Sequence, residues 1–121
     1  MKYRESEEMY LETILLLKKE KACVHSIDIA NELDYSRPSV SRAVGLLQKN
    51  GYITMAQSGE IELTEVGYQK AMEIYERHRL ITQLLMKVGA DEQMAEENAC
   101  RIEHVITSEL FAVLKKYVEE Q

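Results

Sequence analysis

Three side chains that can bind a transition metal lie close together near the C-terminal end of the chain. Cys100, Glu103 and His104 occur in the run Ala99–Val105, which we predict to be helical. On a helix these positions share one face, so a thiol, a carboxylate and an imidazole converge there. Each offers a lone pair once it has lost its proton, and the sequence therefore predicts a metal site at this turn.

A second pair of candidate ligands lies far upstream, on the first predicted helix. Met9 and Glu12 supply a thioether and a carboxylate one helical turn apart. If they bind the same ion as the later three residues, the metal ties the first helix to the last third of the chain and can act as a switch. A lone Met or Cys is usually a core residue, but apolar packing does not require a Cys-x-x-Glu-His spacing, in which Glu103 is costly to bury unpaired.

Two further residues are candidates for a neighbouring ion. His78 lies between two arginines, where it is either a ligand or an exposed histidine. Glu96 falls one helical turn before Cys100 on the same face, and it is either a second-site ligand or solvated helix surface. Cys23 and His25 form an isolated pair that we interpret as structural.

The first half of the chain has the pattern of a winged helix-turn-helix. We predict three helices, two short strands and the turn that joins the strands. The helices are capped by Ser6, Ser26 and Ser36 and end near Lys21, at Asp34-Tyr35 and at Gly51; the strands are Tyr52 to Ala56 and Glu60 to Leu63, with Gly59 in the left-handed turn position.

The second half is predicted to be entirely helical. A long helix from Glu65 to about Lys87, capped by Thr64, ends at Gly89, and Asp91 caps the helix that carries Cys100. A final helix restarts at Thr107-Ser108 and runs to Tyr117. The fold class is therefore mainly α, with a DNA-binding domain in residues 1–70 and a metal-binding and dimerisation domain in residues 71–121.

Charge is segregated along the chain in a way that favours DNA binding by one segment. The net charge is −6, but residues 36–59 contain Arg37, Arg42 and Lys49 and no acid. In a helix-turn-helix the start of the second helix faces the base edges, and helix N-termini and arginines bind phosphate or guanine. The alternative is that these residues only start a helix and cover its surface. The predicted DNA-binding residues are Ser36, Arg37, Pro38, Ser39, Ser41 and Arg42.

Composition excludes several classes of protein. The 121 residues suit one domain or two small ones, and 45% hydrophobic content is ordinary for a globular protein. No apolar run is long enough to span a bilayer, and the N-terminus lacks the apolar core of a signal peptide, so we expect a cytoplasmic protein without membrane contact. Two cysteines are too few for a disulfide framework. No nucleophile or oxyanion motif supports an enzyme, and no organic substrate is expected.

With these residues in view, the chain resembles the diphtheria toxin repressor family of metal-dependent repressors over nearly its whole length. The resemblance is carried by four motifs: Glu8-Met9-Tyr10-Leu11, Ser36-Arg37-Pro38-Ser39-Val40-Ser41, His78-Arg79-Leu80 and Ala99-Cys100-Arg101-Ile102-Glu103-His104-Val105. It implies a homodimer that binds a palindromic operator when loaded with divalent metal and represses metal-uptake genes. It also implies one site formed by Met9, Cys100, Glu103 and His104, with His78 in a neighbouring one.

The resemblance also bears on the metal. The family has an iron-responsive branch with Met and Cys ligands and a manganese-responsive branch with carboxylates at those two positions, and this chain has the iron-type pair. Soft sulfur ligands disfavour Mn²⁺, so Fe²⁺ is the expected metal, Mn²⁺ the alternative, and Co²⁺, Ni²⁺ or Zn²⁺ are surrogates. Glu12 matches the manganese branch, whereas Glu96 and Thr82 depart from the iron branch. We expect the short form of two domains, without the SH3-like third domain of many iron-branch members.

One competing hypothesis remains open at this point. A winged-helix regulator could sense oxidants through Cys100 without any metal, provided that the thiol is reactive. Its DNA binding would then be insensitive to chelators.

Overall fold

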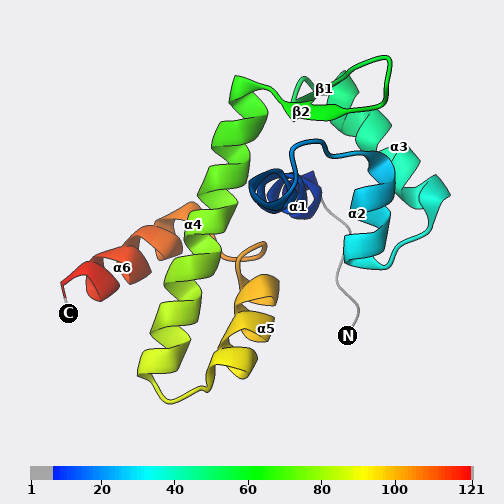
Figure 1. The fold of residues 1–121 in the computed structure, drawn as a ribbon. Coiled ribbons are helices and arrows are strands. Elements are labelled where there is room, and N and C mark those ends of the chain that lie inside the picture. Colours follow the sequence, from blue (N-terminus) through cyan, green and yellow to red (C-terminus); the bar gives the residue numbers. More distant parts are fainter. Residues whose placement is uncertain (1–6, 121) are drawn as a thin grey trace. The chain divides into compact units, whose positions relative to one another are not determined.

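The computed structural model describes residues 7–120, and its helices and strands are drawn in Figure 1. These residues fall into two compact units, one that ends at Met72 and one that begins at Glu73. The predicted cap Ser6 lies outside the described residues.

The first unit is a winged helix-turn-helix, as the sequence predicts. Helices α1 (Glu7–Glu20), α2 (Ser26–Leu33) and α3 (Arg37–Lys49) precede strands β1 (Ile53–Met55) and β2 (Ile61–Leu63). The strands pair antiparallel, and the two outer pairs of the register bring Ile53 opposite Leu63 and Met55 opposite Ile61. Both strands are shorter than predicted: beyond them, the Ala56 N–H donates to the Glu60 carbonyl and the Gly59 N–H turns back to the Ala56 carbonyl.

The core of the first unit comes from the inward faces of all five elements. On α3 the spacing of Val40, Val44 and Leu47 brings them to one buried face, while the polar residues between them lie on the other. Each such side chain stabilises the fold by about 1.5–3 kcal/mol when it leaves water. The buried apolar residues of this unit are Tyr10, Leu11, Ile14, Leu15, Leu17, Val24, Ile29, Ala30, Val40, Val44, Leu47, Ile53, Ile61 and Ala71.

Local capping chemistry sets the ends of the helices, with one departure from prediction. Ser36 caps α3 as expected, and its hydroxyl oxygen accepts from the Ser39 N–H at 3.3 Å. The predicted cap Ser26 is instead the first residue of α2, and His25 is the N-cap. The cause is Asp28, whose carboxylate accepts from the His25 N–H at 2.8 Å and fixes the helix start one residue earlier.

The base of the wing is packed tightly against the start of α4 (Glu65–Lys87). Thr64 caps this helix as predicted: its hydroxyl accepts from the Gly67 N–H at 3.1 Å and donates to the Gly51 carbonyl at 2.7 Å. A Cβ atom at Gly67 would overlap the backbone of Tyr52, including its carbonyl oxygen. Glycine at this position is therefore required for the close approach of helix and wing.

The wing also carries ion pairs to α1. Lys18 Nζ lies 2.6 Å from Glu62 Oε1 and 3.6 Å from Glu60 Oε1. The hydrogen bond from Lys18 lowers the pKa of Glu62. One lysine thus pairs with Glu62 on β2 and with Glu60, the residue before that strand.

The second unit consists of the rest of α4 together with α5 (Glu92–Ile102) and α6 (Ser108–Glu119). Asp91 caps α5 as predicted, and Thr107 caps α6, whose start was predicted at Thr107-Ser108. Helix α5 ends earlier than predicted, at Ile102, and the residues up to Val105 form a turn. The turn tightens because the Val105 and Ile106 amides both donate to the Ile102 carbonyl. The buried apolar residues of this unit are Ile74, Leu80, Ile81, Ala95 and Ala99.

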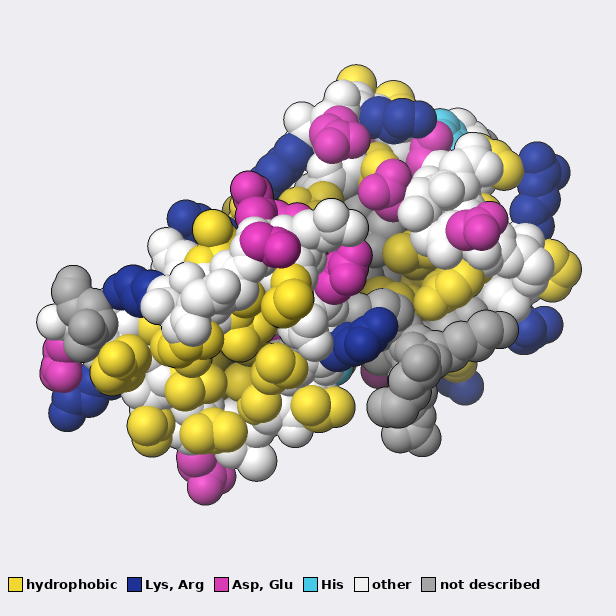
Figure 2. All heavy atoms as spheres, turned by 90° about the horizontal axis from the view of Figure 1, so that it is seen from below, with side chains coloured by type: hydrophobic (Ala, Val, Ile, Leu, Met, Phe, Trp, Pro, Cys, Tyr) yellow, Lys and Arg dark blue, Asp and Glu magenta, His cyan; other side chains and the backbone are white. Residues whose placement is uncertain are grey.

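The second unit also exposes many large apolar side chains. Figure 2 shows hydrophobic side chains gathered over one face of this unit, in the left-hand part of the view. The exposed large hydrophobic residues of the unit are Met86, Val88, Met94, Val105, Leu110, Val113 and Tyr117. Within residues 7–120, no helix is both long and apolar enough to cross a membrane.

Candidate functional site

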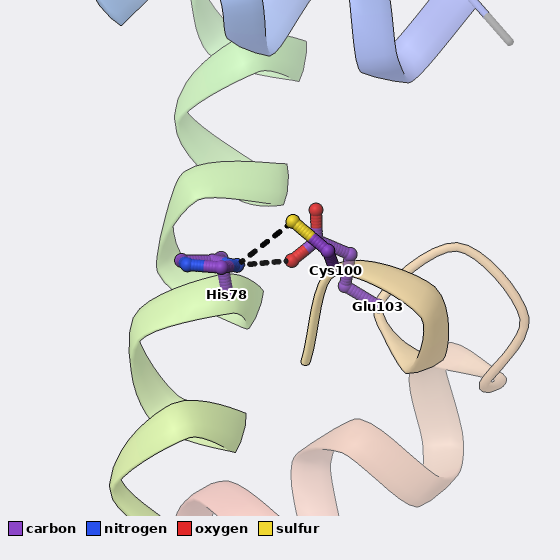
Figure 3. A group of neighbouring side chains, drawn as sticks. All are labelled: His78, Cys100 and Glu103. Carbon is purple, nitrogen blue, oxygen red and sulfur yellow. Dashed lines mark hydrogen bonds and ion pairs between the residues drawn. The ribbon is translucent and has the colours of Figure 1, made fainter. Parts of the chain in front are cut away.

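Three candidate ligands converge in the second unit, as Figure 3 shows. His78 projects from α4, Cys100 from the last turn of α5, and Glu103 from the turn that follows. His78 Nδ1 lies 2.8 Å from Glu103 Oε2 and 3.9 Å from Cys100 Sγ. One nitrogen, one sulfur and one oxygen atom from the three residues lie within 4.8 Å of one another.

The Glu103 carboxylate is the centre of this group. Its side chain is 0% exposed, and Oε2 accepts a hydrogen bond from His78. The other oxygen, Oε1, lies 3.3 Å from His104 Nε2. A buried carboxylate needs such partners, because an ionised group without them costs several kcal/mol. Glu103 therefore brings both histidines and the Cys100 turn into one polar cluster.

The cluster changes the protonation of His78. Hydrogen bonds to Cys100 and then to Glu103 raise the pKa of His78 from 6.5 to about 10, and burial opposes this rise only in part. His78 is consequently protonated at neutral pH when no cation is bound. Its side chain is 22% exposed and paired with Glu103, which argues against the alternative of an exposed histidine between arginines.

The donor set fits a divalent transition metal. Ligand atoms about 2.0–2.3 Å from a tetrahedral ion lie about 3.4 Å from one another. This value falls between the 2.8 Å from His78 Nδ1 to Glu103 Oε2 and the 3.9 Å from His78 Nδ1 to Cys100 Sγ. Imidazole, thiolate and carboxylate together suit Fe²⁺, Co²⁺, Ni²⁺ or Zn²⁺ better than Mg²⁺ or Ca²⁺, which prefer oxygen alone. A bound cation would take the place of the proton that now links the imidazole of His78 to its two partners.

The structure groups His78 with the main ligand turn, whereas the resemblance implied a neighbouring site for it. Glu96 is exposed on α5 and does not belong to this group of candidate ligands among the described residues. Met9 and Glu12 lie on α1 in the first unit. There the Tyr35 hydroxyl donates to the Met9 sulfur at 3.7 Å.

The residues predicted to bind DNA lie at the start of α3. Ser36 Oγ donates to Ser39 Oγ at 3.0 Å, and Arg42 Nη2 donates to the same Ser39 oxygen at 3.4 Å. Arg37, Pro38 and Ser41 are exposed beside them. The helix start thus presents hydroxyls and two guanidinium groups to solvent.

Sequence reasoning missed one residue that contacts the cluster. Arg77 donates to the Glu103 carbonyl at 3.2 Å, yet the sequence indicates only a charged residue beside a candidate ligand. No spacing rule pairs residues 26 positions apart, so only the packing of α4 against the turn reveals it.

Comparison with known proteins places this geometry in a family. The description "Iron dependent repressor, N-terminal DNA binding domain" matches residues 2–60, and "Iron dependent repressor, metal binding and dimerisation domain" matches residues 64–120. The chain belongs to the iron-dependent repressor family. This confirms the resemblance to the diphtheria toxin repressor, and it means that the homologues are metal-dependent transcriptional repressors and not enzymes.

Individual relatives agree with the family. The diphtheria toxin repressor of Corynebacterium diphtheriae is 32% identical over 96% of this chain, which spans 52% of that protein. An uncharacterised HTH-type transcriptional regulator of Methanocaldococcus jannaschii is 31% identical over 96% of this chain and 94% of its own length. The chain therefore spans about half the length of the diphtheria toxin repressor and nearly all of the Methanocaldococcus regulator.

Solved structures share the fold. The manganese regulator SloR superposes with a TM-score of 0.86 at 25% identity, covering 98% of this chain and 56% of SloR. The structure of IdeR from T. acidophilum gives a TM-score of 0.83 at 25% identity, covering 97% of this chain and 55% of that one. Relatives named for iron and for manganese both occur, and a divalent metal cofactor is common to them.

Proposed function

We propose that this iron-dependent repressor family member binds operator DNA as a homodimer when it is loaded with divalent metal, and so controls genes of metal homeostasis. The observation that carries the proposal is the cluster of His78, Cys100 and Glu103, with His104 on the second carboxylate oxygen. Operator DNA is in the cytoplasm, where we expect the protein to act.

Fe²⁺ is the metal that we propose. Cys100 supplies a sulfur ligand within the cluster, and sulfur favours Fe²⁺ over Mn²⁺. The predicted ligands Met9, Glu12 and Glu96 stay predictions of the sequence, and Met9 would add a second sulfur atom. The functional division into residues 1–70 and residues 71–121 is likewise part of the proposal.

Binding to DNA is proposed for the exposed start of α3. Helix N-termini attract phosphate, and Arg37 and Arg42 can bind phosphate or guanine. The small side chains Ser36, Ser39 and Ser41, together with Pro38, permit a close approach to the DNA backbone.

Dimerisation is proposed for the exposed apolar side chains of the second unit. A homodimer buries such side chains, and its twofold symmetry matches a palindromic operator whose half-sites lie about 34 Å apart. Metal binding would act by favouring the dimer geometry that fits this spacing. To change the ratio of DNA-competent to incompetent dimer from 1:99 to 99:1, the metal must bind the competent state more tightly by about 5.5 kcal/mol.

The test is binding of the purified protein to a promoter fragment of a metal-uptake gene. Binding is measured with chelator, then with Fe²⁺ without oxygen, and in parallel with Mn²⁺. We expect binding only with metal and a higher affinity with Fe²⁺. Equal binding with chelator would contradict the proposal, and stronger activation by Mn²⁺ would contradict the choice of metal.

A second function is favoured by one contact. The half-buried Cys100 sulfur lies 3.9 Å from His78 Nδ1, and a thiol that solvent can reach is a site that oxidants can attack. A regulator that senses oxidants would bind DNA equally well with and without chelator and would respond to peroxide. The same DNA-binding experiment separates it from the metal-dependent repressor.

A further inference from the structure

Arg77, the residue before His78 on α4, reaches the segment that joins α5 to α6. Nη1 donates to the Glu103 carbonyl at 3.2 Å and to the Ile106 carbonyl at 3.3 Å, and Nη2 donates to Ser108 Oγ at 3.1 Å. The guanidinium carbon also lies 5.4 Å from the centroid of the Phe111 ring. One side chain therefore contacts both the ligand turn and the first turn of α6.

These bonds satisfy backbone groups that the end of a helix leaves without partners. The last carbonyls of α5 have no intrahelical donor, and Arg77 supplies one to Glu103, the residue that caps α5. A cation at the C-terminus of a helix also interacts favourably with the helix dipole. The planar guanidinium can reach several acceptors at once, which a lysine ammonium on a flexible stem cannot do in the same geometry.

Glu103 is consequently held at two points by neighbouring residues of α4. His78 binds its carboxylate at 2.8 Å, and Arg77 binds its backbone carbonyl. Consecutive helical residues point about 100° apart, so the two contacts restrain the turn from different directions. Rotation of the turn would have to break the Arg77 bonds before the carboxylate could leave the cluster.

We propose that Arg77 is a positioning residue of the metal centre, which holds Glu103 at ligand distance and couples its ligation to the start of α6. The inference rests on the proposed metal site of His78, Cys100 and Glu103. Helix α6 carries the exposed apolar residues Leu110 and Val113. Ligation at Glu103 is thereby transmitted to a helix that presents an apolar surface.

The test compares Arg77→Gln with the matched control Glu76→Gln. Glu76 pairs with Lys115 at 2.7 Å, so the control breaks another contact between α4 and α6 without touching the ligand turn. Co²⁺ is titrated into each protein while the thiolate-to-metal absorption band and the ligand-field band are recorded. Hydrogen exchange at the Leu110 and Phe111 amides is then measured with and without Co²⁺.

We expect Arg77→Gln to weaken Co²⁺ binding roughly 10–100-fold, as loss of a group that orients a metal ligand does, with the thiolate band retained and the ligand-field band changed. Glu76→Gln should bind Co²⁺ within about twofold of wild type, since an exposed ion pair contributes little. Co²⁺ should slow exchange at Leu110 and Phe111 in wild type and in Glu76→Gln, but not in Arg77→Gln.

Wild-type affinity and wild-type metal-induced protection in Arg77→Gln would overturn the inference. If that variant does not fold, Arg77→Lys keeps the charge and loses the planar fork; partial loss of affinity supports the inference, and wild-type affinity overturns it. A wild-type protein without a thiolate band, or a Cys100→Ala variant that keeps one, would instead overturn the proposed metal site and the inference with it.

Discussion

Helix α3, for which DNA binding is proposed, and the turn that carries Glu103 are held in place by different kinds of interaction. Helix α3 is fixed by the apolar side chains of its buried face and by the Ser36 cap. The turn is fixed by ionisable groups: a carboxylate with 0% exposure, two imidazoles and a guanidinium. Apolar packing depends little on pH or metal, whereas the polar cluster responds to both.

In the proposed function, DNA recognition belongs to α3 and regulation by metal belongs to the cluster around Glu103. A helix that reads DNA should keep its surface unchanged while the signal varies, and the apolar packing of α3 suits this proposed role. A sensor needs groups whose charge changes when the signal arrives, and the cluster around Glu103 supplies them. Changes made in one region should therefore leave the other intact, and the following variants test this separation.

The largest effect is expected for Cys100→Ala. Loss of the sulfur ligand should reduce metal-dependent operator affinity by about 100-fold or more. The reason is that several kcal/mol of metal binding free energy shift the dimer to its DNA-competent state. The fold should remain, since the half-buried thiol contributes little to the apolar core. Operator titrations with and without Fe²⁺ measure the loss, and Cys23→Ala, which removes an exposed thiol, serves as the control. Unchanged activation by Fe²⁺ in Cys100→Ala would contradict the assignment of Cys100 as a metal ligand.

Gly67→Ala tests the packing of the first unit. The added Cβ overlaps the backbone of Tyr52, so the free energy of unfolding should fall by about 1–3 kcal/mol, as in other overpacked sites. Gly45→Ala is the matched control, because nothing lies within 4 Å of its added Cβ. Because Gly45 lies within helix α3, Gly45→Ala should raise the free energy of unfolding by about 0.5–1 kcal/mol. Urea unfolding measures both, and equal stability of the two variants would contradict the proposed close contact.

Arg42→Ala tests the separation from the DNA side. Removing one guanidinium contact should weaken operator binding by about 1–3 kcal/mol, or roughly 10–100-fold. Metal affinity should stay at the wild-type value, because Arg42 donates to Ser39 on α3 in the first unit, whereas the cluster of candidate ligands belongs to the second. Fluorescence anisotropy with labelled operator and a separate Co²⁺ titration measure the two affinities. A parallel loss of both would show that the regions are not independent.

The smallest effect is expected from pH. The pKa of His78 is raised from 6.5 to about 10, so its contribution to stability is complete below the unfolded value and is lost as pH rises through about 10. Metal must displace the His78 proton, and metal affinity should therefore rise by at most about tenfold per pH unit from this group. Co²⁺ titrations between about pH 6 and 8 measure the slope of metal affinity against pH. Exposed carboxylates stay ionised throughout this roughly neutral range. A His78→Asn variant should show a smaller slope, and an equal one would remove His78 from the ligand set.

Local features of this fold could be predicted from the sequence, because a few neighbouring residues determine them. Ser36, Thr64, Asp91 and Thr107 each cap a helix through their own side-chain oxygen. The start of α2 was predicted wrongly at Ser26, since Asp28 acts from three positions later. The early end of α5 was missed because a helical spacing of ligands also fits a turn.

Contacts between distant residues could not be predicted in the same way. The pairing of His78 with Glu103 depends on how α4 packs against the end of α5, which no local pattern encodes. The resemblance implies a neighbouring site for His78, and this assignment stays a prediction. The contribution of Met9, Glu12 and Glu96 to metal binding stays a prediction for the same reason, because ligand type and spacing alone do not fix distances.

The ion pairs of Lys18 affect how a salt titration of DNA binding should be interpreted. Lys18 neutralises Glu62 and, at a longer distance, Glu60 on the wing. Added salt screens the longer-range repulsion between these carboxylates and nearby phosphates more than it screens the contact pair, so the repulsion weakens as the ionic strength rises. The slope of log K against log salt then includes the protein's own charges as well as released counterions, and it understates the number of phosphates contacted. A Glu62→Gln reference is needed to count them.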